Sequence, residues 1–164
     1  MPGLCAQVVN GAPPLLRGQL PRDRATRREE HLTELGLQHL ANQKAYTLSG
    51  GERRRLEISR ALVTKPKFLL MDEPFGALDE MTRDHLNLQL LDIWKETETT
   101  ILFVTHSIPE AVFLGQKVLI LKANPGRIKE VVQVDLPFPR EIALREMPKF
   151  NKYCGLLRKL LEEC

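Results

Sequence analysis

Two adjacent carboxylates, Asp72 and Glu73, directly follow a run of four apolar residues, Phe68 to Met71. A continuous apolar run of this length is typical of a central strand that is buried on both faces of a parallel sheet. Ligands of open α/β sheets bind beyond the carboxyl ends of the strands. One carboxylate could therefore hold Mg²⁺, while the other orients or deprotonates an attacking water. The alternative is a pair of solvated acids at a strand end.

A possible anion site begins at Ser49. Ser49 and Glu52 have the spacing of a capping box, which predicts a helix from Ser49 to about residue 63. Gly50 and Gly51 lie at its start, where free N–H groups and the helix dipole attract anions. Glycine also lets the backbone approach a phosphate closely. Phosphate binding and an ordinary capped helix are both consistent with this pattern.

A histidine follows the second apolar run of strand length. Residues 100 to 104 are predicted to form that strand, and His106 comes just after it. Ser107 is the predicted cap of the next helix, with Pro109 in its first turn. A contact with a terminal phosphate is one role for His106, and a structural histidine is the other.

The remaining pattern predicts the elements that must position these residues. Strands alternating with helices predict an α/β domain with a largely parallel sheet. We divide the chain into an irregular segment (1–23), a helical part (24–63), an α/β core (64–135) and a C-terminal helical extension (136–164). Further predicted elements are a charged helix over 24–35, a helix over 80–95, a hairpin over 118–134 and an amphipathic C-terminal helix.

Composition limits the class of protein. The 164 residues are 43% hydrophobic and 27% charged, which is typical of a globular domain. A net charge of +3 is too small to argue for nucleic acid as a partner. Three widely spaced cysteines indicate free thiols in a reducing compartment. Without a long apolar run or a secretory signal, we expect a cytoplasmic protein that would work at a membrane only through a partner.

The motifs together resemble the nucleotide-binding subunit of ABC transporters. Ser49 precedes Asp72 by 23 residues, and Asp72 precedes His106 by 34. The matching text is Leu48-Ser49-Gly50-Gly51, Leu69-Leu70-Met71-Asp72-Glu73-Pro74, Gly76-Ala77-Leu78-Asp79 and Thr105-His106. This resemblance implies a P-loop NTPase-like ABC ATPase fold, with a mostly parallel sheet and a helical subdomain. It also implies ATP and Mg²⁺ as cofactors.

The resemblance implies roles in the chain's own nucleotide pocket for three residues. Asp72 would help to hold Mg²⁺, Glu73 would be the catalytic base, and His106 would contact the γ-phosphate.

Five other residues would serve the pocket of a second ATP-binding subunit in a head-to-tail dimer. Ser49, Gly50 and Gly51 would bind the γ-phosphate held by that partner. Glu52 stands where the family often has Gln, and its charge would weaken this attraction. Asp79 would cross the dimer interface.

Longer stretches of text resemble a narrower group, the importers of nitrate, sulfonates such as taurine, and bicarbonate. These stretches are residues 81–87, 105–114, 124–128 and 135–137. The resemblance implies membrane permease subunits and, indirectly, a solute-binding protein as partners, on the inner face of the cell membrane. The solute would be chosen by those partners.

One motif of the family has no counterpart in this chain. A P-loop needs a Gly-Lys pair followed by Ser or Thr, and the sequence contains no Gly-Lys pair. We therefore expect the family fold without its N-terminal βαβ portion, with weak or absent ATP binding by the chain alone. The alternatives are a non-catalytic remnant, a half-site that offers Ser49 to an intact partner, and a soluble ABC-type ATPase of DNA maintenance.

Overall fold

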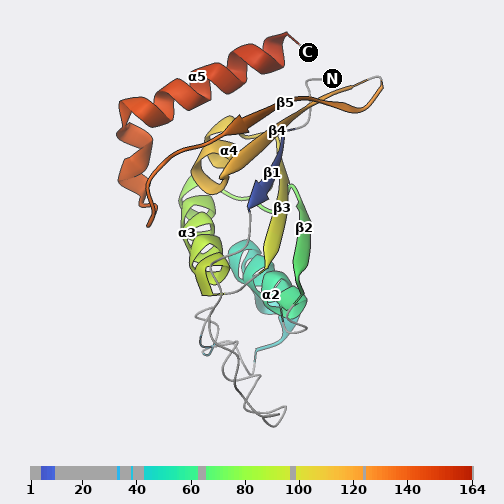
Figure 1. The fold of residues 1–164 in the computed structure, drawn as a ribbon. Coiled ribbons are helices and arrows are strands. Elements are labelled where there is room, and N and C mark those ends of the chain that lie inside the picture. The colour runs from blue at the N-terminus through green and yellow to red at the C-terminus, as the bar shows by residue number, and fades with distance from the viewer. Residues whose placement is uncertain are drawn as a thin grey trace.

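The computed structural model describes residues 5–9, 33, 38, 43–62, 66–96, 99–123 and 125–163. Five strands form one sheet in the order β2-β3-β1-β4-β5 (Figure 1). They are β1 (Cys5–Val9), β2 (Phe68–Asp72), β3 (Thr100–Thr105), β4 (Lys117–Lys122) and β5 (Arg127–Gln133). The helices are α2 (Gly50–Leu62), α3 (Glu80–Glu96), α4 (Ile108–Leu114) and α5 (Pro148–Glu162), with short 3₁₀ turns η2 (Ala45–Thr47) and η3 (Ile142–Glu146).

The sheet is mixed in its strand directions. β2 and β3 are parallel, and Asp72 lies opposite Val104 in their register. β1 is antiparallel to both β3 and β4, and β4 and β5 form the predicted antiparallel hairpin. β2, β3 and β4 therefore run in the same direction, although only the β2–β3 pairing is parallel among the described strands. The predicted α/β fold is confirmed, but the largely parallel sheet is not, because β1 and β5 run opposite to the other described strands and make their pairings antiparallel.

Two further expectations about the strands are wrong. The first is that residues 1 to 23 are irregular, because residues 5–9 form β1 between β3 and β4. Pro and Gly residues lie on both sides of this segment, but none interrupts it. The rest of that segment and, apart from Thr33, the helix predicted over 24–35 lie outside the described residues.

The second wrong expectation is that the run ending at Met71 is a strand buried on both faces. β2 is an edge strand of the described sheet, since β3 is its only neighbour there. Met71 is buried, whereas Phe68 and Leu70 on the opposite face are 55% and 58% exposed. An apolar run therefore identified the strand correctly but not its place in the sheet.

The hydrophobic core lies between the sheet and the helices α3 and α4, which are on one side of it in Figure 1. The sheet contributes Ile101 and Phe103 from β3 and Val118 and Ile120 from β4, all at most 1% exposed. Phe75, in the turn after β2, packs on Phe103 with ring centroids 5.5 Å apart. The segment that follows Glu73 is thereby tied to the core.

A buried arginine closes the C-terminal end of α4. Arg140 donates to the carbonyl oxygens of Val112 (3.2 Å), Phe113 and Gly115 (2.9 Å). These carbonyls have no partner further along the helix, and the cation also suits the negative end of the helix dipole. Burial lowers the pKa of Arg140 to about 10, so it stays charged at neutral pH.

α5 is the predicted amphipathic C-terminal helix, and it packs against α4 and β4. Phe150 and Leu157 face the core, whereas Leu156 is 43% exposed. None of the helices in the described ranges has both the length and the apolar character needed to cross a bilayer.

Leu157→Ala should lower the free energy of unfolding by about 2–5 kcal/mol, because it leaves a cavity at a fully buried position. The control is Leu156→Ala, which should change it by no more than about 0.5 kcal/mol. Urea denaturation followed by circular dichroism measures both values. Equal effects would contradict this docking of α5.

Candidate functional site

The turn after β2 holds Glu73 in an unusual backbone conformation. Glu73 has a φ of 42°, which lies in the left-handed region that non-glycine residues rarely adopt. Its N–H donates to the carbonyl oxygen of Val104 (2.8 Å), and its own carbonyl accepts from the N–H of Gly76 (3.2 Å). Such a conformation costs of order 1–3 kcal/mol and persists only where surrounding contacts enforce it. No pattern in the sequence indicated it.

Glu73 and His106 meet above the ends of two parallel strands. The Oε1 atom of Glu73 lies 3.0 Å from Nδ1 of His106. Both side chains are accessible, at 44% and 65% exposure. Parallel pairing of β2 with β3 brings them together, as expected for groups at the carboxyl ends of neighbouring strands. This approach is an ion pair when the imidazole is protonated.

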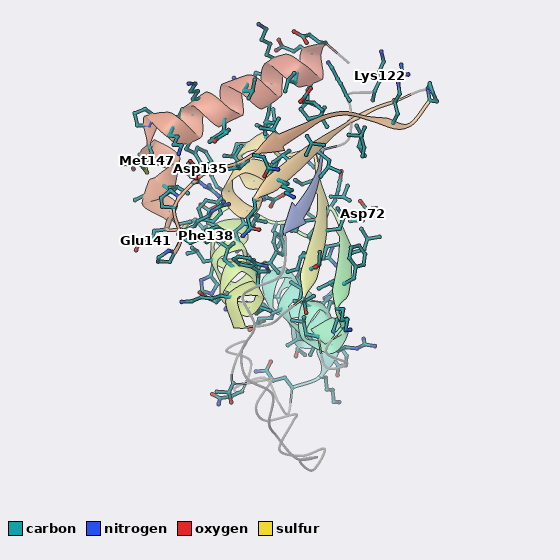
Figure 2. All side chains as sticks on the ribbon, viewed as in Figure 1. Asp72, Lys122, Asp135, Phe138, Glu141 and Met147 are labelled. Carbon is teal, nitrogen blue, oxygen red and sulfur yellow. The ribbon has the colours of Figure 1, made fainter. Side chains whose placement is uncertain are left out.

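Asp72 is the last residue of β2, and its side chain is exposed. It lines a cavity of about 200 Å³ between α2 and β2. The walls are mostly apolar, with charged groups from Arg54, Glu57 and Asp72. Figure 2 shows Asp72 well apart from Asp135 and Phe138, so the C-terminal segment near those residues does not contribute to this cavity.

A bound metal would have to rely on few protein ligands. No group of three His, Cys, Asp or Glu side chains in the described ranges could hold an ion. Mg²⁺ at nucleotide sites is usually held by one or two carboxylates, together with phosphate oxygens and water. The single exposed carboxylate of Asp72 fits that arrangement.

The predicted capping box at the start of α2 is present. The N–H of Ser49 donates to Oε2 of Glu52 (2.7 Å), and the N–H of Glu52 donates to Oγ of Ser49 (3.3 Å). Ser49 and Gly50 are exposed, whereas Gly51 is buried. The Glu52 carboxylate therefore engages one of the donors that a phosphate would use.

Asp79 caps the next long helix, α3. Its Oδ1 accepts from the N–H of Thr82 (3.0 Å), and this hydrogen bond lowers the pKa of the exposed carboxyl. The start of α3 also packs against the start of α2. A methyl group added at Gly51 would lie 2.8 Å from Cγ2 of Thr82, and one at Gly50 would lie 3.2 Å from Cδ2 of Leu78. Residues 49–52 and 78–82 thus adjoin one another.

Arg54 is a contact that the sequence did not indicate. From the second turn of α2 it donates to the carbonyl oxygen of Pro74 and pairs with Glu57. It therefore connects the helix that starts at Ser49 to the turn that carries Glu73. In the sequence it is the middle residue of a run of three arginines, Arg53 to Arg55.

Comparison with known proteins gives consistent results. Residues 5–76 match the family model described as ABC transporter. A taurine import ATP-binding protein of Rhizobium johnstonii is 48% identical over 147 residues, which is 85% of this chain and 55% of that protein. An aliphatic sulfonates import ATP-binding protein of Bacillus subtilis is 50% identical over 112 residues, which is 67% of this chain and 43% of that protein. The chain spans about half the length of the curated relatives it matches.

Solved structures agree with the sequence matches. A component of the cbiONQ ABC transporter complex of Clostridium perfringens superposes with a TM-score of 0.65 at 27% identity, covering 85% of this chain and 56% of that one. An inward-facing ABC transporter of metal-chelate type gives a TM-score of 0.58 at 32% identity, covering 68% and 45%. The fold class predicted from the sequence is thereby confirmed, over part of those chains.

Gly51→Ala should lower the free energy of unfolding by about 1–2 kcal/mol, since the added methyl overlaps Cγ2 of Thr82. Thr82→Ser removes that methyl, so Gly51→Ala should cost less in the Thr82→Ser background. Gly155→Ala is the control in an open helical position, and there alanine should stabilise by up to about 1 kcal/mol. Chemical denaturation checks all four variants. An equal cost of Gly51→Ala in both backgrounds would rule out this close contact.

Proposed function

Because this chain is homologous to the ATP-binding proteins of ABC transporters and spans about half their length, we propose that it supplies part of an ATPase that powers solute import. The observation that carries the proposal is the 3.0 Å contact between Glu73 and His106 at the ends of two parallel strands. The names of the taurine and sulfonate relatives favour an organic sulfonate, or a similar small anion, as the solute.

Each residue of this pair has a distinct task. An attacking water would donate its proton to a carboxylate oxygen of Glu73 as its oxygen bonds to the γ-phosphorus of ATP, while the bond from that phosphorus to the β,γ-bridging oxygen breaks and ADP leaves. When both of its ring nitrogens are protonated, His106 can pair with the same carboxylate through Nδ1 and donate its Nε2–H to a phosphate oxygen. Asp72 would hold Mg²⁺, which neutralises charge on the phosphates when it is bound. The 44% exposure of Glu73 leaves room for water to approach it.

A second group of residues would serve a partner subunit. Ser49 and Gly50 are exposed at the start of the 13-residue helix α2, where N–H groups and the helix dipole favour an anion. Asp79 is exposed beside them. We assign this surface to the γ-phosphate of an ATP held by another ATP-binding subunit, in a head-to-tail dimer. Permease subunits at the inner face of the cell membrane would complete the transporter, with the ATPase on the cytoplasmic side.

The sequence itself favours a second role. It contains no Gly-Lys pair, so these 164 residues have no P-loop to cradle a triphosphate. The surface at Ser49 and Gly50 does not depend on that loop. A chain that offers this surface to an intact partner, while binding ATP weakly itself, is therefore the alternative function.

Glu73→Gln should reduce ATP hydrolysis about 10²–10⁴-fold and leave ATP binding unchanged, because it removes the proton acceptor and keeps the shape. The measurement uses this chain fused behind the P-loop half of a relative, with phosphate release and nucleotide affinity as readouts. Asp92→Asn, an exposed carboxylate near the end of α3, is the control and should have no effect. Normal turnover by the Glu73→Gln variant would refute the assigned role.

Glu52→Gln should tighten ATP-dependent dimerisation of the same fusion about two- to fivefold. Gln preserves the capping box but removes a negative charge from the helix terminus that would bind phosphate. Sedimentation with ATP in the Glu73→Gln background measures the dimer affinity, and Glu162→Gln on α5 is the matched control. Weaker dimerisation of the Glu52→Gln variant would mean that this helix end does not receive a phosphate.

A further inference from the structure

The turn that carries His106 is anchored on both sides by one buried hydroxyl. Thr105 is the last residue of β3 and is 2% exposed. Its Oγ1 accepts from the N–H of Ser107 (3.0 Å) and donates to the carboxylate of Glu110. His106 lies between Thr105 and Ser107, which the first of these hydrogen bonds joins, so the path of its backbone is fixed while its ring is exposed.

This arrangement differs from the capping box at α2. There the N-cap N–H of Ser49 donates directly to the carboxylate of Glu52, which is half-buried. At α4, Ser107 Oγ accepts from the N–H of Glu110 (3.4 Å), but the return contact runs through the hydroxyl of Thr105. Capping α4 requires only the hydrogen bond between Ser107 and Glu110. The two hydrogen bonds of the Thr105 hydroxyl additionally connect α4 to the end of β3, on the other side of His106.

The carboxylate in this connection is expensive to bury. Glu110 is 4% exposed, and this burial raises its pKa. The hydrogen bond from Thr105 and the nearby charges of Arg83, His106 and Arg145 act in the opposite direction but do not outweigh the burial. Those arginines come from two other elements. Arg83 on α3 donates to the carbonyl oxygen of Leu78 (2.8 Å), and Arg145 in η3 pairs with Asp84.

The positive charges near Glu110 come from other segments of the chain. Arg83 on α3 and Arg145 in η3 act on it electrostatically and are themselves bonded to Leu78 and Asp84, and the Arg145 guanidinium lies 5.1 Å from the ring centroid of Phe113. An exposed glutamate would cap α4 at less cost. A buried one, joined to Thr105 by a hydrogen bond, fixes the direction in which residues 105–107 leave the strand.

We propose that Thr105 and Glu110 are positioning residues, which hold the 105–107 turn so that His106 reaches Glu73. The inference rests on the proposed function, because it assigns the pair a purpose in ATP hydrolysis. It concerns the His106–Glu73 contact in the nucleotide-free chain, however, so it can be tested where hydrolysis is absent.

The test measures which ring nitrogen of neutral His106 carries the proton in the full chain. The structure places Nδ1 against Glu73, which favours the Nδ1–H form. Imidazole ¹⁵N chemical shifts report the fraction of each form, and Glu73→Ala defines the value for an unpaired ring. Thr105→Val and Glu110→Met remove the donor and the acceptor of the buried hydrogen bond. Each should move the fraction at least about halfway to the Glu73→Ala value.

Two conservative variants separate positioning from general damage. Thr105→Ser keeps the hydroxyl, and Glu110→Gln keeps an acceptor oxygen, so both should retain the wild-type fraction of the Nδ1–H form. If Thr105→Val and Glu110→Met also retain it, with wild-type circular dichroism, the proposal is wrong. Should Glu110→Met not fold, the Thr105→Val and Thr105→Ser pair decides alone, because valine has the shape of threonine.

The tautomer measurement and the hydrolysis measurement can fail separately. If the fusion with the P-loop half of a relative fails to hydrolyse ATP while the tautomer fractions follow the expected order, the assigned activity is wrong and the positioning role stands. If hydrolysis is normal and the fractions do not respond to Thr105→Val, the positioning role is wrong and the assigned activity stands.

Discussion

The site depends on the parallel pairing of β2 with β3. That register places Asp72 opposite Val104, and the N–H of Glu73 continues it by donating to the Val104 carbonyl (2.8 Å). From there Glu73 leaves the strand with a positive φ, and His106 leaves β3 two residues after Val104. A slip of one residue would turn every side chain of β2 to the other face, and the two groups would no longer meet. Phe75, in the turn after β2, packs on Phe103 of β3, and this buried contact holds the same register.

Local pattern was sufficient to predict most of the elements. The capping box at Ser49 fixed the start of α2, Ser107 and Pro109 fixed the start of α4, and apolar runs located β2 and β3. Each of these signals lies within a few residues of the feature it predicts. The α/β fold followed from the alternation of predicted strands and helices, and the resemblance to ABC transporter subunits followed from the order and spacing of the motifs.

What the sequence could not show was determined by contacts between distant residues. Nothing local distinguishes β2 at an edge from a strand buried on both faces, because its exposure depends on which strands lie beside it. The positive φ of Glu73 follows from the Val104 and Gly76 contacts. Arg54 reads as one of three surface arginines until the turn at Pro74 is placed against it. Glu110 likewise reads as an ordinary residue of a first helical turn, and only the fold buries it.

The open edge of β2 has a consequence for how the protein behaves in solution. In the described part of the chain, β2 combines unpaired peptide groups on one side with the exposed side chains of Phe68 and Leu70. Edges of this kind pair readily with other extended chains. An extended segment, from this chain or from a second copy, would therefore add at this edge of the described sheet, and pairing between copies would rise with their concentration.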